Sequence, residues 1–232
     1  MSAVVYLIPT VLEEEAIETI PAYLLDAVKT CQVIFAEQER TTRRFLKKMD
    51  KSIVIDDFEW FAIHKAEDAV QNQFRQKIKE GKKIAIISEA GCPGVADPGQ
   101  LLVAVAQQMG VPVKPLVGPS SILLALMASG MNGQIFSFWG YLPIDNMERQ
   151  KQIRELEAQS AKQGGTHIFI ETPYRNDQLL EQLIKICKPA TRICVGYNLT
   201  AKNEWVQTKT AAQWKQNIPA LHKVPCIFLI QA

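Results

Sequence analysis

Short apolar runs rich in β-branched residues recur along this chain, and longer amphipathic segments separate them. In the first half these runs cover residues 4–8, 33–36, 52–55, 84–88 and 111–116. An apolar run of this length is typical of a strand that is buried on both faces of a sheet. Because the intervening segments have the length of helices, the alternation predicts an α/β fold with a mostly parallel sheet covered on both faces.

The segments between these runs predict helices at residues 20–29, 40–49, 64–80 and 101–109. In residues 66–78 the apolar side chains recur mostly at spacings of three and four, as they do on one face of a helix. Gly81 and Gly110 directly follow two of the predicted helices. A glycine is common at that position because it adopts the left-handed conformation that ends a helix.

The second half repeats the pattern less regularly. It predicts helices at residues 121–129, 147–163, 176–187 and 211–216, and strands at residues 167–171, 192–197, 204–208 and 225–231. The step from Gly118 to Pro119 is typical of a boundary between two folded parts. We therefore expect two α/β domains with mostly parallel sheets, an N-terminal domain at residues 1–116 and a C-terminal domain at residues 117–232.

Composition narrows the class of protein. Apolar residues make up 47% of the chain and charged residues 22%, which is typical of a folded domain. The net charge of +2 is not that of a dedicated nucleic-acid binder, so an RNA partner would have to be held by a local patch of the chain or by a dimer. Five cysteines without C-x-x-C spacing predict reduced thiols in the cytoplasm, and the three histidines show no metal-ligand spacing, so we expect no metal site. We also expect no signal peptide and no membrane-spanning segment.

The stretch S-E-A-G-C-P-G-V-A-D-P-G at residues 88–99, called the 88–99 loop below, follows a predicted strand. Ligands of parallel α/β sheets bind beyond the carboxyl ends of the strands, so this loop is a candidate site. Three glycines and two prolines indicate a backbone that turns sharply or approaches something closely. Glu89 and Asp97 would repel phosphate, and no phosphate-binding motif is present. The loop therefore predicts a site for a neutral or cationic small molecule.

Other polar segments after strands each have two interpretations. The acids at residues 13–15 either belong to a site or form a solvated first helical turn. The basic residues between 43 and 48 form either a solvated helix face or an RNA-contacting patch. Ser120 or Ser121 caps a helix whatever else it does, and Trp139 belongs either to the core or to a binding platform.

Four stretches together resemble the tetrapyrrole (corrin/porphyrin) methylase superfamily of S-adenosylmethionine-dependent methyltransferases. They are the 88–99 loop, P-L-V-G-P-S-S-I-L-L-A-L at residues 115–126, F-S-F-W-G-Y-L-P at residues 136–143 and F-I-E-T-P-Y-R at residues 169–175. The branch that is most similar 2′-O-methylates a cytidine ribose in small-subunit ribosomal RNA. The resemblance implies a cytoplasmic enzyme, commonly a homodimer, with its cofactor in the cleft between two α/β domains.

The resemblance also implies residues for the site. S-adenosylmethionine would be bordered by Glu89, Ala90, Gly91, Cys92, Ser120, Ser121, Ile122, Ile170, Leu199 and Pro225. The candidates for methyl transfer are Glu37 as a general base, with Glu171, and with Arg40 and Arg175 holding phosphate or polarising the acceptor hydroxyl. An internal ion pair between Glu37 and Arg40 is the alternative for these two residues.

The sequence departs from the pattern of that ribosomal RNA branch in two segments of the first half. Residues 9–15 read P-T-V-L-E-E-E where the branch has P-T-P-I-G-N-L, and residues 36–40 read A-E-Q-E-R where it has A-E-D-T-R. These segments are expected to meet the methyl acceptor more than the cofactor. Methylation of a tetrapyrrole or another small molecule is therefore one alternative function, and a non-catalytic member that binds the cofactor or RNA is another.

Overall fold

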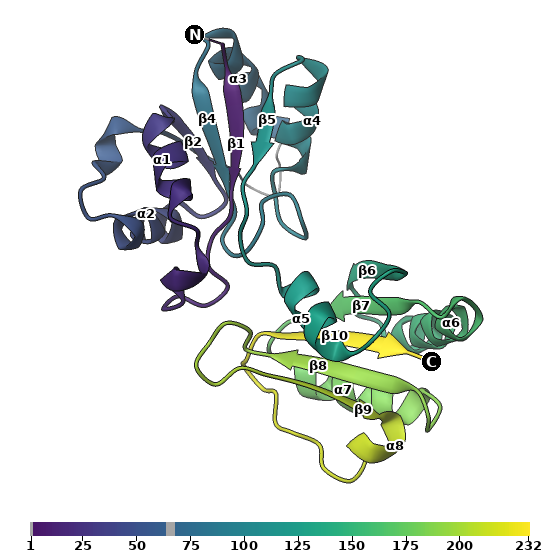
Figure 1. The fold of residues 1–232 in the computed structure, drawn as a ribbon. Coiled ribbons are helices and arrows are strands. Elements are labelled where there is room, and N and C mark those ends of the chain that lie inside the picture. The colour runs from purple at the N-terminus through teal and green to yellow at the C-terminus, as the bar shows by residue number, and fades with distance from the viewer. Residues whose placement is uncertain (1, 64–67) are drawn as a thin grey trace. The chain divides into compact units, whose positions relative to one another are not determined.

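The computed structural model describes residues 2–63 and 68–232. It forms two compact units, Met1–Ser120 and Ser121–Ala232 (Figure 1). The division falls after Ser120, and the domain boundary expected from the sequence follows residue 116. Each unit contains one five-stranded sheet, so each is described by itself.

The sheet of the first unit is entirely parallel, as the sequence predicts. Its strands lie in the order β3 (Glu59–Ala62), β2 (Val33–Ala36), β4 (Lys83–Ile87), β1 (Val4–Ile8) and β5 (Val113–Pro115). Of the three central strands, β2 and β4 are almost completely buried because helices cover both faces, whereas β1 is buried at Val5 and Ile8 and partly buried elsewhere. Their carboxyl ends consequently lie along one edge of the sheet.

The strand predicted at residues 52–55 is wrong. Ile53 is buried in the core without pairing in the sheet, and Ile55–Asp57 forms a short 3-10 helix, η2. The edge strand is β3 instead, where Phe61 stacks on Phe35 of β2 with ring centroids 4.8 Å apart. An apolar run that packs against a helix and one that joins a sheet have the same sequence pattern, so periodicity did not separate them.

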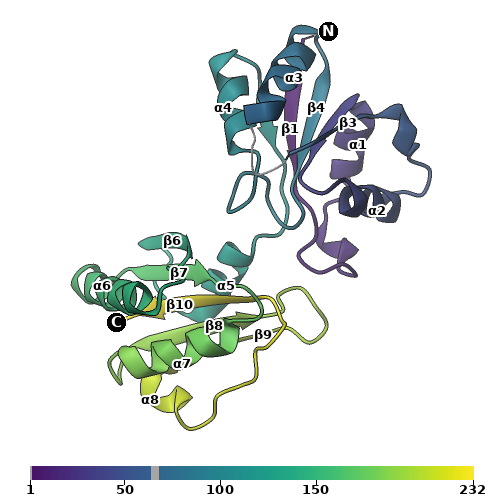
Figure 2. The ribbon, with the colours of Figure 1, turned by 180° about the vertical axis from the view of Figure 1, so that it is seen from behind.

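Helices cover the two faces of this sheet in pairs (Figures 1 and 2). Apolar side chains of α1 (Tyr23–Thr30) and α2 (Glu39–Met49) pack on one face, and those of α3 (Asp68–Lys79) and α4 (Gln100–Gln108) pack on the other. The helix predicted at residues 64–80 extends into residues 64–67, which lie outside the described residues. Gly81 and Gly110 have φ angles of 73° and 66°, which confirms their predicted role at helix ends.

The sheet of the second unit differs from the prediction. Its strands lie in the order β6 (Phe136–Tyr141), β7 (Thr166–Ile170), β10 (Cys226–Gln231), β8 (Arg192–Tyr197) and β9 (Trp205–Thr210). Only the β6–β7 pair is parallel, and the other three pairs are antiparallel. The expectation of a mostly parallel sheet is therefore wrong here, because β8 and β9 form a hairpin and the last strand inserts in the opposite direction between β7 and β8.

Four helices cover the second sheet. Contacts place α5 (Ser121–Ser129) on β8, β9 and β10, whereas α6 (Asn146–Gln163), α7 (Asn176–Ile186) and α8 (Ala211–Trp214) pack together (Figure 1). The Asp145 carboxylate accepts hydrogen bonds from two backbone N–H groups at the start of α6, and Gly164 ends that helix with a φ of 67°. Among the helices in the described part of the chain, none is both long and apolar enough to cross a membrane.

Candidate active site

Three loops of the first unit meet at the edge of the sheet where β1, β4 and β5 end. The backbone N–H of Thr10, after β1, donates to the carbonyl of Gly91, after β4, over 2.9 Å. The Sγ atom of Cys92 lies 3.5 Å from the carbonyl oxygen of Pro119, in the loop after β5. This is the edge at which the sequence predicts a ligand site.

Close approach of backbone explains the glycines of these loops. The three glycines of the 88–99 loop, Gly91, Gly94 and Gly99, have φ angles of 71°, 78° and 120°, so the predicted sharp turns are present. At Gly118 a Cβ atom would lie only 2.3 Å from the Cβ and Cγ atoms of Pro9. The backbone at Gly118 therefore packs directly on the Pro9 ring, and a larger residue at position 118 would separate the two loops.

Three carboxylates cluster beside this packing. The Glu37 Oε2 atom accepts a hydrogen bond from the backbone N–H of Glu89 over 2.9 Å, which orients the Glu37 carboxylate. Burial, followed by the nearby charges of Glu37 and Glu89, raises the pKa of Asp97 to about 7. The cluster repels anions and favours a cationic group, in agreement with the interpretation of the 88–99 loop from sequence.

Glu37 and Arg40 lie close in sequence but form no ion pair in the described structure. The Arg40 side chain is exposed at the start of α2, and the Glu37 carboxylate turns to the 88–99 loop instead. The internal ion pair considered from sequence is therefore absent. Glu37 is consequently held at the same sheet edge as the 88–99 loop.

Glu171 and Arg175 are engaged with each other. Arg175 donates from Nη2 to Glu171 Oε1 over 2.6 Å and from Nε to the same oxygen over 3.1 Å, and the Thr172 N–H donates to it over 2.7 Å. The Glu171 side chain is only 1% exposed, against 29% for Arg175. This arrangement ties the turn between β7 and α7 together and buries the Glu171 carboxylate against Arg175.

The cofactor positions expected in the first unit lie on two of its loops. Glu89, Ala90, Gly91 and Cys92 open the 88–99 loop, and Ser120 ends the loop after β5. Cys92 is half-buried, and its burial, followed by the charge of Asp97, raises the pKa of its thiol. It therefore remains a neutral thiol at physiological pH.

The positions expected in the second unit fall into two places. Ser121 and Ile122 begin α5, whereas Ile170, Leu199 and Pro225 lie where β7 ends, just after β8 ends and just before β10 begins. Because β10 runs antiparallel to both neighbours, these three residues share one edge of the second sheet. The structure thus brings them together although the sequence separates them widely.

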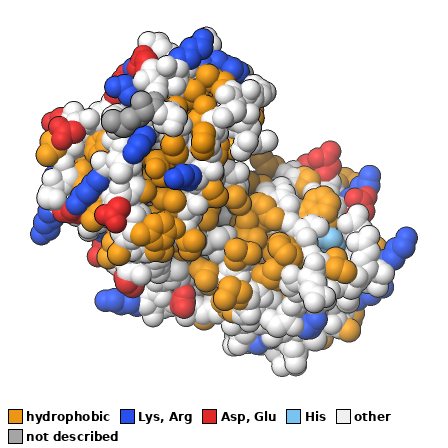
Figure 3. Space-filling view, turned by 45° about the horizontal axis from the view of Figure 1, so that its top comes forward, with side chains coloured by type: hydrophobic (Ala, Val, Ile, Leu, Met, Phe, Trp, Pro, Cys, Tyr) orange, Lys and Arg blue, Asp and Glu red, His pale blue; other side chains and the backbone are white. Residues whose placement is uncertain are grey.

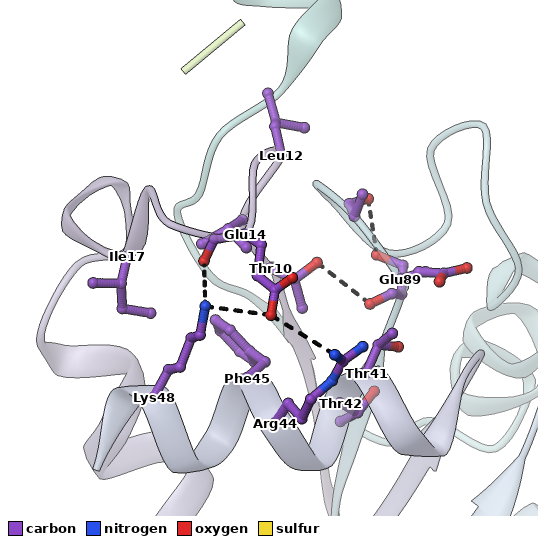
Figure 4. Close-up of a pocket in the computed structure, with 13 residues that line it drawn as sticks. Thr10, Leu12, Glu14, Ile17, Thr41, Thr42, Arg44, Phe45, Lys48 and Glu89 are labelled. Carbon is purple, nitrogen blue, oxygen red and sulfur yellow. Dashed lines mark hydrogen bonds and ion pairs between the residues drawn. The ribbon is translucent and has the colours of Figure 1, made fainter. Parts of the chain in front are cut away.

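A cavity of about 240 Å³ lies within the first unit, and the sequence did not predict it (Figure 4). Its walls come from residues 10–17 after β1, from one face of α2 and from the first residues of the 88–99 loop; we call it the α2 pocket. Thr41, Arg44, Phe45 and Lys48 supply the helix wall at spacings of three and four. That spacing is the sequence signal that could have found the pocket, since it places these four side chains on one helix face.

The part of the chain that the structure describes contains neither a metal-ligand cluster nor a disulfide. Within residues 2–63 and 68–232, no group of three or more His, Cys, Asp or Glu side chains could hold a metal ion. The five cysteines are free thiols, and all except Cys92 are buried. The residues that the structure describes thus agree with the reduced thiols expected from sequence.

The fold is that of the tetrapyrrole methyltransferases. The uroporphyrin-III C-methyltransferase of Thermus thermophilus superposes with a TM-score of 0.56 and 16% identity, covering 100% of this chain and 93% of that one. The methyltransferase CobJ superposes with a TM-score of 0.63 and 16% identity, covering 99% and 93%. At this identity the likeness establishes the fold.

The model of the family Tetrapyrrole (Corrin/Porphyrin) Methylases matches residues 17–214, and the chain belongs to this family. The family expected from the four sequence stretches is thereby confirmed. Two relatives are named ribosomal RNA small subunit methyltransferase I. The protein of Vibrio cholerae is 30% identical over 90% of this chain and 69% of its own length, and that of Bacillus subtilis is 31% identical over 87% and 65%. The chain thus spans about two thirds of the length of these relatives.

Proposed function

We propose that this chain is an S-adenosylmethionine-dependent methyltransferase that methylates the 2′-hydroxyl of a ribose in ribosomal RNA, and that it works as a homodimer in the cytoplasm. Family membership carries the proposal, and the names of the relatives support the choice of acceptor. The carboxylate cluster at the edge of the first sheet supports a cationic cofactor.

The residues present fit the cofactor in the first unit. Gly91 and Gly118 let the loops after β1, β4 and β5 approach closely at this sheet edge. Glu37, Glu89 and Asp97 place negative charge beside it, which suits a sulfonium and an amino group. When bound, S-adenosylmethionine supplies the electrophilic methyl group.

Glu37 is the residue that we assign to the acceptor hydroxyl. A ribose hydroxyl has a high pKa, so a base must accept its proton as the oxygen becomes nucleophilic. The Glu89 N–H holds Glu37 Oε2, and we therefore assign Oε1 as the atom that receives the proton. Arg40 is exposed on the first turn of α2 and holds a phosphate of the acceptor in this proposal. Glu171 and Arg175 keep the turn after β7 closed and take no direct part.

Calorimetry with S-adenosylhomocysteine followed by a transfer assay tests the proposal. The assay measures tritiated-methyl incorporation into small ribosomal subunits from cells that lack this modification, with nucleoside analysis of the product. We expect binding and incorporation by the wild-type chain. We expect Glu37→Gln to lose incorporation and to bind S-adenosylhomocysteine more weakly but measurably, because Glu89 and Asp97 of the carboxylate cluster remain. Glu18→Gln, an exposed acid outside the site, is the control for the change of charge.

Three outcomes would contradict parts of the proposal. Absence of S-adenosylhomocysteine binding would argue for a non-catalytic member of the family. Binding with methyl transfer to a tetrapyrrole such as uroporphyrinogen III, and none to RNA, would identify the small-molecule alternative, which the fold likeness to uroporphyrin methyltransferases favours. Incorporation that survives Glu37→Gln would remove Glu37 from the mechanism. Light scattering coupled to size-exclusion chromatography tests the homodimer.

A further inference from the structure

The α2 pocket combines cations, hydroxyl groups and an apolar floor in one cavity. Arg44 and Lys48 project from the same face of α2, and Phe45 lies between them, largely buried (Figure 4). Glu89 lines the wall contributed by the 88–99 loop, on the side away from Lys48. The helix wall is therefore the basic wall of the pocket.

A carboxylate of the chain itself is placed between these two cations. Glu14 Oε1 lies 3.4 Å from Lys48 Nζ and 3.9 Å from Arg44 Nη1, and the Glu14 carbonyl accepts from Lys48 over 3.0 Å. Glu15 contacts Lys48 at 2.8 Å, and its carboxylate raises the pKa of the Lys48 ammonium. An anion thus occupies the position in which a phosphate oxygen would meet both side chains.

The carboxylate is held loosely enough to be exchanged. The Glu14 side chain is 59% exposed, and it belongs to a loop segment that departs from the pattern of the ribosomal RNA branch. Exposed ion pairs contribute little to stability, so a ligand phosphate can replace this carboxylate without a large loss. The contact therefore behaves as an internal competitor for the basic wall.

An unsatisfied hydroxyl in the same wall points to a polar ligand. Thr42 lines the pocket, is 1% exposed, and its Oγ1 has no hydrogen-bond partner among the described residues. The carbonyl of Gln38, the usual acceptor for a hydroxyl at this spacing, already accepts from the Thr42 N–H and from Thr41 Oγ1. Buried hydroxyls are nearly always paired, so a bound ligand is a natural source of the missing partner.

We propose that the α2 pocket binds a nucleotide unit of the RNA acceptor, with Arg44 and Lys48 holding its phosphate, and that Glu14 closes this site until RNA displaces it. Arg44 also borders a shallow depression lined by Arg40, Arg43 and Glu39, in which Glu39 pairs with Arg43, so Arg40 is the cation that continues the basic wall toward a neighbouring phosphate. The choice of RNA rests on the proposed function. The three structural observations, namely the basic wall, the competing Glu14 carboxylate and the unpaired Thr42 hydroxyl, do not depend on the proposed function.

The test measures binding of a fluorescein-labelled single-stranded RNA by anisotropy at several salt concentrations. Glu14→Gln removes the competitor, and we expect affinity to rise about threefold to tenfold. Lys48→Gln removes a phosphate contact, and we expect weaker binding and a salt dependence reduced by about 0.7 in the slope of log K against log salt. Glu13→Gln is the matched control, because Glu13 does not line the pocket and its carboxylate accepts from the Glu15 N–H, which a Gln oxygen can replace, and we expect no change.

The two proposals fail in different ways. Equal effects of Glu13→Gln and Glu14→Gln, or unchanged binding by Lys48→Gln in a chain that still methylates RNA, would overturn the pocket assignment and leave the function intact. Absence of RNA binding and of methyl transfer to RNA by the wild-type chain would overturn the RNA function and this inference together. Opposite shifts by Glu14→Gln and Lys48→Gln are the result that supports the site.

Discussion

Replacement of Gly118 by alanine is the sharpest test of how the loops of the first unit pack. Its Cβ atom would lie 2.3 Å from both the Cβ and the Cγ atoms of Pro9, whereas ordinary contacts of this kind are 3.4–4 Å. The proline ring is fixed to its own backbone and has no rotamer that moves it away. One of the two loops must therefore shift by about 1 Å or more.

The magnitude follows from two opposing effects. Overpacking of this kind costs about 1–3 kcal/mol, and the rigid neighbour places Gly118→Ala in the upper part of that range. The loss of backbone freedom in the unfolded chain returns about 0.4–1 kcal/mol, because Gly118 does not have a left-handed φ. We expect a net loss of about 2 kcal/mol in the free energy of unfolding, and weaker binding of S-adenosylhomocysteine because the loops at the site separate.

Urea unfolding followed by circular dichroism measures the change, and calorimetry measures the affinity. Gly133→Ala is the matched control, since its new Cβ atom meets nothing within 4 Å and its φ is not left-handed. That variant should be unchanged or slightly more stable. The double variant Pro9→Gly with Gly118→Ala should recover part of the loss as a coupling energy. A Gly118→Ala variant within about 0.5 kcal/mol of the wild type would refute the packing argument.

Three further variants or reagents test other parts of the site. Arg175→Ala leaves the buried Glu171 carboxylate without its cation. We expect the free energy of unfolding in urea to fall by about 2–4 kcal/mol, less than for a fully buried pair because Arg175 is partly exposed. A fall of under 1 kcal/mol would contradict the structural role of this pair. Asp97→Asn should stabilise the chain at pH 8 but not near pH 4. The pKa of Asp97 is about 7 in the folded chain against an ordinary 3.8, so its ionisation destabilises the fold progressively as pH rises from about 4 to about 7. Equal gains in stability at both pH values would exclude ionisation of Asp97 as the cause. Iodoacetamide should label Cys92 before the four buried cysteines, and S-adenosylhomocysteine should slow that reaction; labelling unaffected by the ligand would remove Cys92 from the cofactor surface.

Local pattern was sufficient for four of the five strands of the first sheet and for many helix ends. Strands buried on both faces must be apolar throughout, and this requirement makes parallel strands visible in sequence. Gly81, Gly110 and Gly164 marked helix ends because only glycine adopts the left-handed conformation there without strain. The run at residues 52–55 was wrongly predicted as a strand. It is apolar for the same reason as a strand, burial, but it is buried by packing on a helix and not by pairing in the sheet.

Strand direction in the second unit was beyond local pattern. The last strand, β10, lies between β7 and β8, so its direction depends on segments that are far away in sequence. Which carboxylate faces the candidate site also depends on contacts between segments that are far apart in sequence. Glu37 and Glu171 both follow strands and are both candidates from sequence, with Glu37 as the expected base. Tertiary contacts orient Glu37 beside the 88–99 loop and bury Glu171 against Arg175.

By itself, the sequence determined the α/β class, the family and the sharp turns of the 88–99 loop, because these depend on burial pattern and on what glycine and proline allow within a few residues. Tertiary structure decided where charges meet. It placed Glu14 between Arg44 and Lys48, which lie about thirty residues further along the chain, and it enclosed a pocket there that no single segment contains. Such pairings depend on distances across the fold, and residue order does not specify those distances.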